Sequence, residues 1–207
     1  MTKIDIGFAL SATSRDASVT IKLMQESIKS IIDTYGTTNL HYSVMTFDER
    51  PQVLVRFANK HSSEELKEII EESVIPSSGS PDLEKALIEA KKLFDEAGAR
   101  PDAKKFLIVF MDNKSKNNRI VIVDAVKPII PECWVIPAGV GEEVDKEELE
   151  VLTPLRNTTV TAPKTANPDE VAKEIIDRIK QSKLPADQDY VQVLFFSTLF
   201  FIFITFF

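Results

Sequence analysis

The segment Phe106-Leu107-Ile108-Val109-Phe110-Met111 is an unbroken apolar run that ends at Asp112. Such a run is typical of a central strand in a parallel sheet, because helices then cover the strand on both faces. Residues 3–10 place Ile4, Ile6, Phe8 and Leu10 on one face with small residues between them, and residues 133–140 form another apolar run. These segments predict buried strands at the centre of one sheet.

The rest of the chain alternates between helical and strand patterns. Apolar spacing predicts helices over residues 21–35, 62–70, 83–97, 120–130 and 168–179, with a capping box at Ser62 and Glu65. Ser80 and Pro81 are expected to begin the third helix, and residues 40–47 and 53–57 to form a hairpin. The predicted fold class is α/β: a doubly wound, mostly parallel, Rossmann-like sheet with one antiparallel edge strand and helices on both faces.

Composition limits the function classes. The 207 residues carry a net charge of −7, with 43% hydrophobic and 28% charged residues, which indicates one globular domain. An acidic chain without basic clusters argues against nucleic acid as a partner. The single cysteine, Cys133, excludes an internal disulfide framework, and the two histidines, His41 and His61, provide no zinc cluster.

The composition changes abruptly near the C-terminus. We expect one domain over residues 1–183, followed over residues 184–207 by a linker and an apolar, Phe-rich tail. Residues 190–207 carry no charge and, if helical, would span about 27 Å, close to the ~30 Å of a bilayer core. Two interpretations stay open, a membrane anchor or translated intron sequence, and only the first would bring the chain to a membrane. The N-terminus leads directly into a strand pattern, so no signal peptide is expected in this chain.

Ligands of such sheets bind beyond the carboxyl ends of the strands, where the strand order reverses. Residues 3–10 and 106–111 are the expected neighbours at that point. The sequence therefore directs attention to three loops: residues 11–16, 77–82 and 112–116.

These segments resemble the von Willebrand factor A-type domain, the family of the integrin inserted domains. Ile4-Asp5-Ile6-Gly7-Phe8-Ala9-Leu10-Ser11 resembles the first strand of the family, which normally ends in Asp-x-Ser-x-Ser. The segment from Gly98 to Val109 resembles its lead-in to the fourth strand, where Met111-Asp112-Asn113 replaces the usual Thr-Asp-Gly. Trp134 to Gly141 and Glu147-Glu148-Leu149 resemble the fifth strand and the following helix.

The resemblance implies a metal-ion-dependent adhesion site, which here is degenerate. Its ligand positions fall on Ser11, Thr13, Arg15, Pro81 (or Ser80 with a shift of one residue) and Asp112. Only the aspartate is retained. Arg15 lies in the same loop, and its positive charge would repel a cation ~4 Å away by about 4 kcal/mol at an effective dielectric of ~20. We therefore expect no cofactor, or only weakly bound magnesium or manganese at Ser11, Thr13 and Asp112. Arg15 is expected to pair with Asp112, and Asp16 or Asp82 could supply a replacement carboxylate.

The expected function is a non-enzymatic binding module for an extracellular-matrix or cell-surface protein, with Ser11, Thr13, Arg15, Ser80 and Asp112 at its ligand-binding edge. The alternative is a structural spacer domain from a larger multidomain protein. An enzyme is disfavoured because the loops offer no nucleophile with a base and no phosphate cradle. The family resemblance implies an extracellular or cell-surface location, where a glycan on the acceptor triplet Asn113-Lys114-Ser115 would crowd the edge.

Overall fold

The computed structural model describes residues 2–73, 79–153 and 158–182. They form a six-stranded sheet with the order β3-β2-β1-β4-β5-β6. Every neighbouring pair is parallel except β2 and β3, which are antiparallel. The predicted parallel sheet with one antiparallel edge strand is therefore confirmed. The strands are β1 (Ile4–Ser11), β2 (Leu40–Phe47), β3 (Pro51–Val55), β4 (Lys104–Met111), β5 (Cys133–Val140) and β6 (Val160–Ala162).

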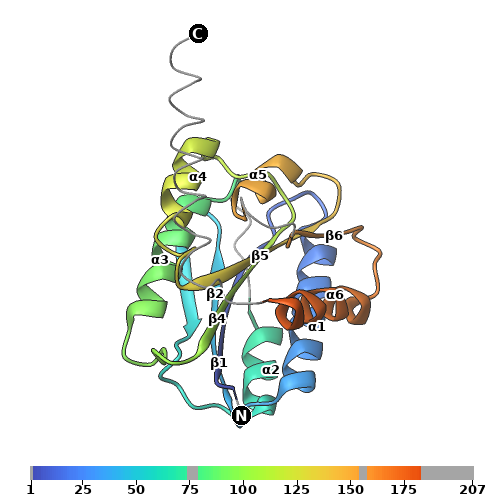
Figure 1. Cartoon of the computed structure of the whole chain (residues 1–207). Coiled ribbons are helices and arrows are strands. Elements are labelled where there is room, and N and C mark those ends of the chain that lie inside the picture. Colours follow the sequence, from blue (N-terminus) through green and yellow to red (C-terminus); the bar gives the residue numbers. More distant parts are fainter. Residues whose placement is uncertain (1, 74–78, 154–157, 183–207) are drawn as a thin grey trace.

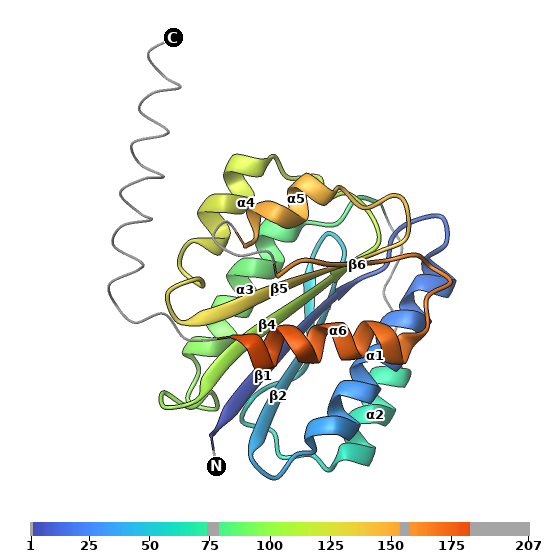
Figure 2. The same ribbon diagram turned by 45° about the vertical axis from the view of Figure 1, so that its right-hand side comes forward.

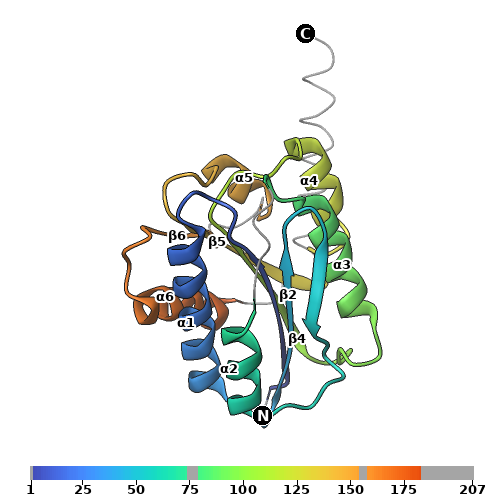
Figure 3. The ribbon, with the colours of Figure 1, turned by 180° about the vertical axis from the view of Figure 1, so that it is seen from behind.

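Helices cover both faces of the sheet. The first, second and last helices lie on one face and the other three on the opposite face, as Figures 1 and 3 show. In Figure 2, α6 runs across the front of the sheet beside α1. The helices are α1 (Ala17–Tyr35), α2 (Ser63–Glu71), α3 (Leu83–Asp95), α4 (Arg119–Val126), α5 (Lys146–Val151) and α6 (Pro168–Gln181).

The strand β4 divides the core in two. Phe106, Ile108 and Phe110 belong to the cluster under α1, α2 and α6, whereas Leu107 and Val109 belong to the cluster under α3, α4 and α5. Alternate side chains of a strand point to opposite faces, so an uninterrupted apolar run is required where both faces are covered. The apolar run that predicted β4 is therefore explained by the burial of both faces of this strand.

Several predicted boundaries were wrong. The helix α1 begins at Ala17 rather than at residue 21, α3 ends at Asp95 rather than at residue 97, and α4 ends at Val126 rather than at residue 130. The helix α3 begins at Leu83, with Asp82 as the N-cap whose side chain accepts the Lys85 N–H, so Ser80 and Pro81 lie before the helix. Strand β3 covers residues 51–55 rather than 53–57, because pairing with β2 begins at the turn itself, where Pro51 lies opposite Phe47. The capping box at Ser62 and Glu65 is confirmed.

Gly98, in the turn after α3, allows a close backbone approach. A Cβ atom at this position would lie 2.2 Å from the backbone nitrogen of Ala58, a distance that no side chain tolerates. Only glycine at this position allows this turn to lie so close to the segment that follows β3.

The linker and the Phe-rich tail over residues 184–207 fall outside the described residues. Among the residues that are described, no helix combines the length and the apolar character needed to cross a membrane.

A buried ion pair stabilises the end of the sheet where β1 begins. Asp5 is fully buried, and its carboxylate accepts the Arg100 backbone N–H at 2.7 Å and the guanidinium at 2.8 and 2.6 Å. The same guanidinium donates to the carbonyls of Ile4 and Asn39. A buried charge is tolerated only when it is paired and hydrogen-bonded in this way.

We predict that Asp5→Ala lowers the free energy of unfolding by about 3–5 kcal/mol, because it leaves the largely buried guanidinium of Arg100 without its counter-charge. Lys3→Ala is the matched control, since it removes the solvent-exposed pair with Asp102 next to the same strand and should cost less than about 1 kcal/mol. Urea unfolding of both variants measures the difference. Equal losses would contradict the assigned role of the buried pair.

Candidate functional site

Three loops meet where β1 and β4 end. These two strands are neighbours, with Ser11 opposite Met111, so Asp112 emerges beside the loop of residues 12–16. The Lys116 N–H donates to the Pro81 carbonyl at 3.0 Å and joins the β4–α4 loop to the segment before α3. We call the described parts of these loops, residues 11–16, 79–82 and 112–118, the three-loop edge. The predicted meeting of the loops is confirmed.

Asp112 is the centre of this edge. Its side chain is 1% exposed, and its Oδ1 accepts the backbone N–H groups of Thr13 at 2.7 Å and Ser14 at 3.2 Å. Its Oδ2 accepts the hydroxyls of Ser14 at 2.7 Å and Thr20 at 2.5 Å. A carboxylate offers about four lone-pair positions, so these four donors saturate it.

Arg15 does not pair with Asp112, and that expectation was wrong. The Arg15 side chain is 89% exposed and its Nε donates to Glu143 Oε1 at 2.8 Å. The carboxylate of Asp112 is instead satisfied by uncharged donors from the same loop and from the first turn of α1. The backbone N–H groups of Thr13 and Ser14 point toward Asp112, so the side chain of the next residue, Arg15, points away into solvent.

The remaining predicted ligand positions provide few oxygen atoms that could bind a metal ion. The hydroxyl oxygens of Ser11 and Thr13 are buried and have no hydrogen-bond partner within the described part of the chain. Pro81 has no side-chain oxygen, and Ser80 is exposed. Across residues 2–73, 79–153 and 158–182, no three His, Cys, Asp or Glu side chains are grouped where together they could hold a metal ion.

These residues do not fit a divalent cation. Hard cations such as magnesium and manganese bind several oxygen ligands and usually need carboxylates to offset their charge. Here the one carboxylate has its lone pairs occupied, and the other two oxygens are neutral hydroxyls. A cation could bind Asp112 only by displacing hydrogen bonds that the fold already makes.

The two carboxylates considered as replacements are both engaged by lysines. Asp16 Oδ2 lies 2.5 Å from Lys164 Nζ. Asp82 Oδ2 lies 2.9 Å from Lys85 Nζ and 3.1 Å from Lys116 Nζ. Burial alone would raise the pKa of Asp82, but hydrogen bonds from these lysines and from Asn117 outweigh it and hold the pKa at about 2.

Sequence reasoning missed Thr20 and Glu148. Thr20 lies on the buried face of α1 with Met24, Ser27 and Ile28. A polar residue on a buried face requires a hydrogen-bond partner, and this rule could have identified Thr20 from the sequence. Glu148 on α5 is 2% exposed and accepts both the N–H and the hydroxyl of Ser115, which is itself buried. Burial raises the pKa of Glu148 despite these hydrogen bonds.

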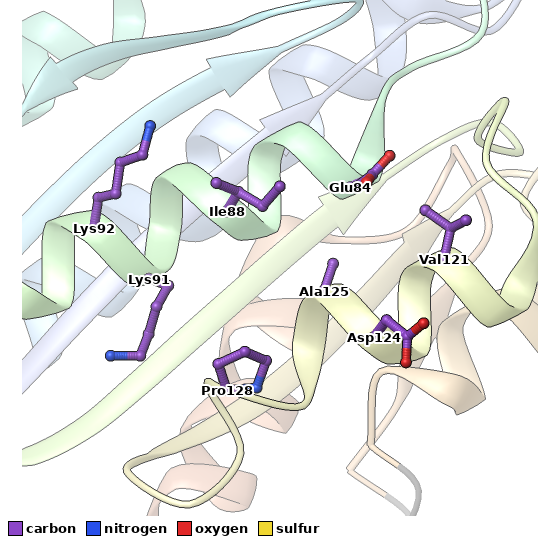
Figure 4. Close-up of a pocket in the computed structure, with 8 residues that line it drawn as sticks. All are labelled: Glu84, Ile88, Lys91, Lys92, Val121, Asp124, Ala125 and Pro128. Carbon is purple, nitrogen blue, oxygen red and sulfur yellow. The ribbon is translucent and has the colours of Figure 1, made fainter.

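A separate hollow lies between α3 and α4. Its volume is about 440 Å³, and Figure 4 shows Ile88, Val121 and Ala125 between charged side chains of both helices. The lining contains no serine, cysteine or histidine and thus no pairing of a nucleophile with an imidazole base. It is lined by helix residues and by Pro128, not by the three-loop edge.

The histidines lie away from the edge. His41, on β2, is paired in register with Asp5 at the opposite end of the sheet, and its Nδ1 lies 3.2 Å from the Gly98 carbonyl. His61 precedes α2 and lies near Glu65. Cys133 is buried, as expected for a residue that fills core volume, and burial raises the pKa of its thiol.

The sheet order, the switch between β1 and β4 and the three loops at that edge define an α/β binding domain of the Rossmann-like type. The sequence matches the model of the von Willebrand factor type A domain over residues 5–197, and the chain belongs to this family. Members of this family are generally non-enzymatic modules that mediate protein–protein interactions.

Solved structures share this fold. Proximal thread matrix protein 1 from the mussel byssus superposes with a TM-score of 0.77 at 20% identity, covering 86% of this chain and 48% of that chain. The same mussel protein has been solved with a zinc-occupied metal-ion-dependent adhesion motif, with a TM-score of 0.76 at 21% identity and the same coverage. Manganese-loaded TRAP protein from Plasmodium vivax superposes with a TM-score of 0.69 at 14% identity, covering 86% of this chain and 73% of that chain. The chain spans about half the length of the mussel protein chain.

The low pKa of Asp82 predicts a pH dependence of stability. Its ordinary pKa is 3.8 and its folded value is about 2, so the carboxylate stabilises the fold fully above about pH 4 and progressively less as the pH falls toward 2. The difference corresponds to about 2 kcal/mol at pH 6, and about half of it is lost by pH 3. Asp82→Asn keeps an N-cap side chain but removes the charge.

Urea unfolding of the wild-type chain and of Asp82→Asn at pH 6, 4 and 3 should show a stability gap that narrows as the pH falls. A gap that stays constant, or widens toward pH 3, would show that the lysine contacts do not depress the pKa of Asp82.

Proposed function

We propose that this chain is a non-enzymatic protein-binding module of the adhesion type, with an extracellular-matrix or cell-surface protein as its ligand. The observation that carries the proposal is the three-loop edge of a von Willebrand factor A-type chain, in which hydrogen bonds join all three loops into one surface. Asp112 links the first loop to the third, and Lys116 links the third to the second. A surface whose loops are already held together loses little conformational entropy on binding.

The outward side chains of this edge are suited to polar recognition. Arg15, Lys114 and Lys116 are exposed and carry positive charge at the rim. Acidic side chains lie among them, since Lys114 Nζ is 3.2 Å from Asp145 Oδ2 and Arg15 is held by Glu143. Alternating charges give specificity for a protein partner with complementary charges. The net charge of −7 argues against a polyanionic partner such as nucleic acid.

We propose that the ligand binds without a divalent cation. The saturated carboxylate of Asp112 and the neutral oxygens of Ser11 and Thr13 support this, because they offer a dication no free anionic ligand. The absence of a histidine from the described part of the edge supports a binding role over catalysis. The location proposed is extracellular or cell-surface, which is consistent with the fold shared with a matrix protein of the mussel byssus.

The second candidate is a structural spacer domain from a larger multidomain protein. The observation that favours it is the internal satisfaction of Asp112, which leaves that residue nothing to offer a partner directly. In this case the exposed rim would be a solvated surface without a ligand.

We predict that the wild-type chain binds at least one protein from a panel of collagens and other matrix proteins, with equal affinity in EDTA and in magnesium. Arg15→Glu, at the edge, should weaken that binding about tenfold or more through lost charge pairing. Lys60→Glu is the matched control, because it makes the same charge change at an exposed site beyond the opposite end of the sheet. Surface plasmon resonance at physiological salt measures both.

Three outcomes would count against the proposal. Binding to no member of the panel would favour the spacer. Equal weakening by Arg15→Glu and Lys60→Glu would place the ligand away from the edge. Binding that EDTA abolishes would restore a role for a cation.

A further inference from the structure

The hydrogen bonds to Asp112 connect three parts of the fold. The carboxylate follows β4, two of its donors are backbone N–H groups of Thr13 and Ser14, and the other two are side-chain hydroxyls. One hydroxyl belongs to Ser14 in the first loop and the other to Thr20 in the first turn of α1. One side chain therefore fastens the first loop and the start of a helix to the end of the neighbouring strand.

The Thr20 hydroxyl is committed to this role. Its oxygen also lies 3.4 Å from the Asp16 carbonyl and 3.3 Å from the Ala17 carbonyl, but Asp112 Oδ2 at 2.5 Å is much closer. A hydroxyl has one proton to donate, and a charged acceptor holds it more strongly than a carbonyl does. Thr20 is 1% exposed, so water does not compete for this hydrogen bond.

Ser14 contributes twice. Its backbone N–H and its hydroxyl both donate to Asp112, and its oxygen in turn accepts the Asp16 N–H at 3.3 Å. These contacts define the course of the loop up to the residue before α1. No cation is needed to hold the loop against β4, because neutral donors already do so.

We propose that Asp112, Thr13, Ser14 and Thr20 form a hydrogen-bonded clasp that holds the first loop and the start of α1 against the end of β4 in one conformation, in place of a bound cation. Ser14 and Thr20 are its positioning residues. The edge is therefore insensitive to divalent cations, and no metal-driven change of shape regulates it. The clasp concerns the edge alone and does not depend on the ligand proposed above, so its failure is seen in measurements that contain no ligand.

Hydrogen exchange tests the clasp in the isolated full chain. In the double variant Ser14→Ala/Thr20→Val, the Thr13 amide, which donates to Asp112, should lose protection about tenfold or more, whereas amides in the middle of β4 should change much less. Ser27→Ala is the matched control, because it removes a buried α1 hydroxyl that donates only to Leu23 of its own helix. It should leave the Thr13 amide unchanged.

The cation dependence is tested on the same samples. Adding magnesium or manganese should change neither the melting temperature nor the Thr13 protection of the wild-type chain. Ser11→Asp/Arg15→Ser, which supplies a second carboxylate and removes the nearby positive charge, should gain a melting temperature that rises with manganese.

The clasp would be overturned by sub-millimolar magnesium or manganese binding to the wild-type chain that Asp112→Ala abolishes. It would also be overturned by unchanged Thr13 protection in the folded double variant.

Discussion

Parallel pairing of β1 with β4 places the ends of two strands, distant in sequence, beside each other. Ser11 lies opposite Met111, and the chain then diverges into two loops that must satisfy their polar groups at a crowded edge. A backbone N–H that is buried without a partner costs free energy comparable to a lost hydrogen bond, and a charged carboxylate buried without one costs considerably more. The contacts between the first loop and Asp112 resolve that cost for both partners at once, so the geometry of the edge follows from the register of two central strands.

The sheet carries a buried carboxylate at each end, and the two are neutralised differently. Asp5, at the start of β1, lies against the guanidinium of Arg100 and forms an ion pair. Asp112, after β4, is surrounded by backbone and hydroxyl donors that carry no charge. The first arrangement fixes the turn after α3 to the sheet. The second leaves a negative charge under the loops that face solvent.

The fold was predictable because its central strands are buried on both faces, which leaves unbroken apolar runs, and its helices on one face, which leaves a periodic apolar stripe. The site was predictable only in its position. The direction of Arg15 depends on Glu143, which is distant in sequence, and no local pattern encodes such a contact. The N-cap of α3 was misplaced because Ser80, Pro81 and Asp82 all suit a helix start, and in the structure it is the Asp82 side chain that accepts the Lys85 N–H. Thr20 shows that a polar residue on a buried helix face deserves a search for its acceptor.

If the domain is extracellular, as proposed above, the burial of Ser115 limits when Asn113 can be glycosylated. Asn113-Lys114-Ser115 is an acceptor triplet, and a glycosyl-transferring enzyme must engage the hydroxyl at its third position as well as the asparagine. In the folded chain that hydroxyl lies beneath α5, bonded to Glu148. Any sugar on Asn113 must then be attached while the nascent chain is still extended, before α5 packs over the loop, so the extent of modification would record how fast this corner of the domain folds.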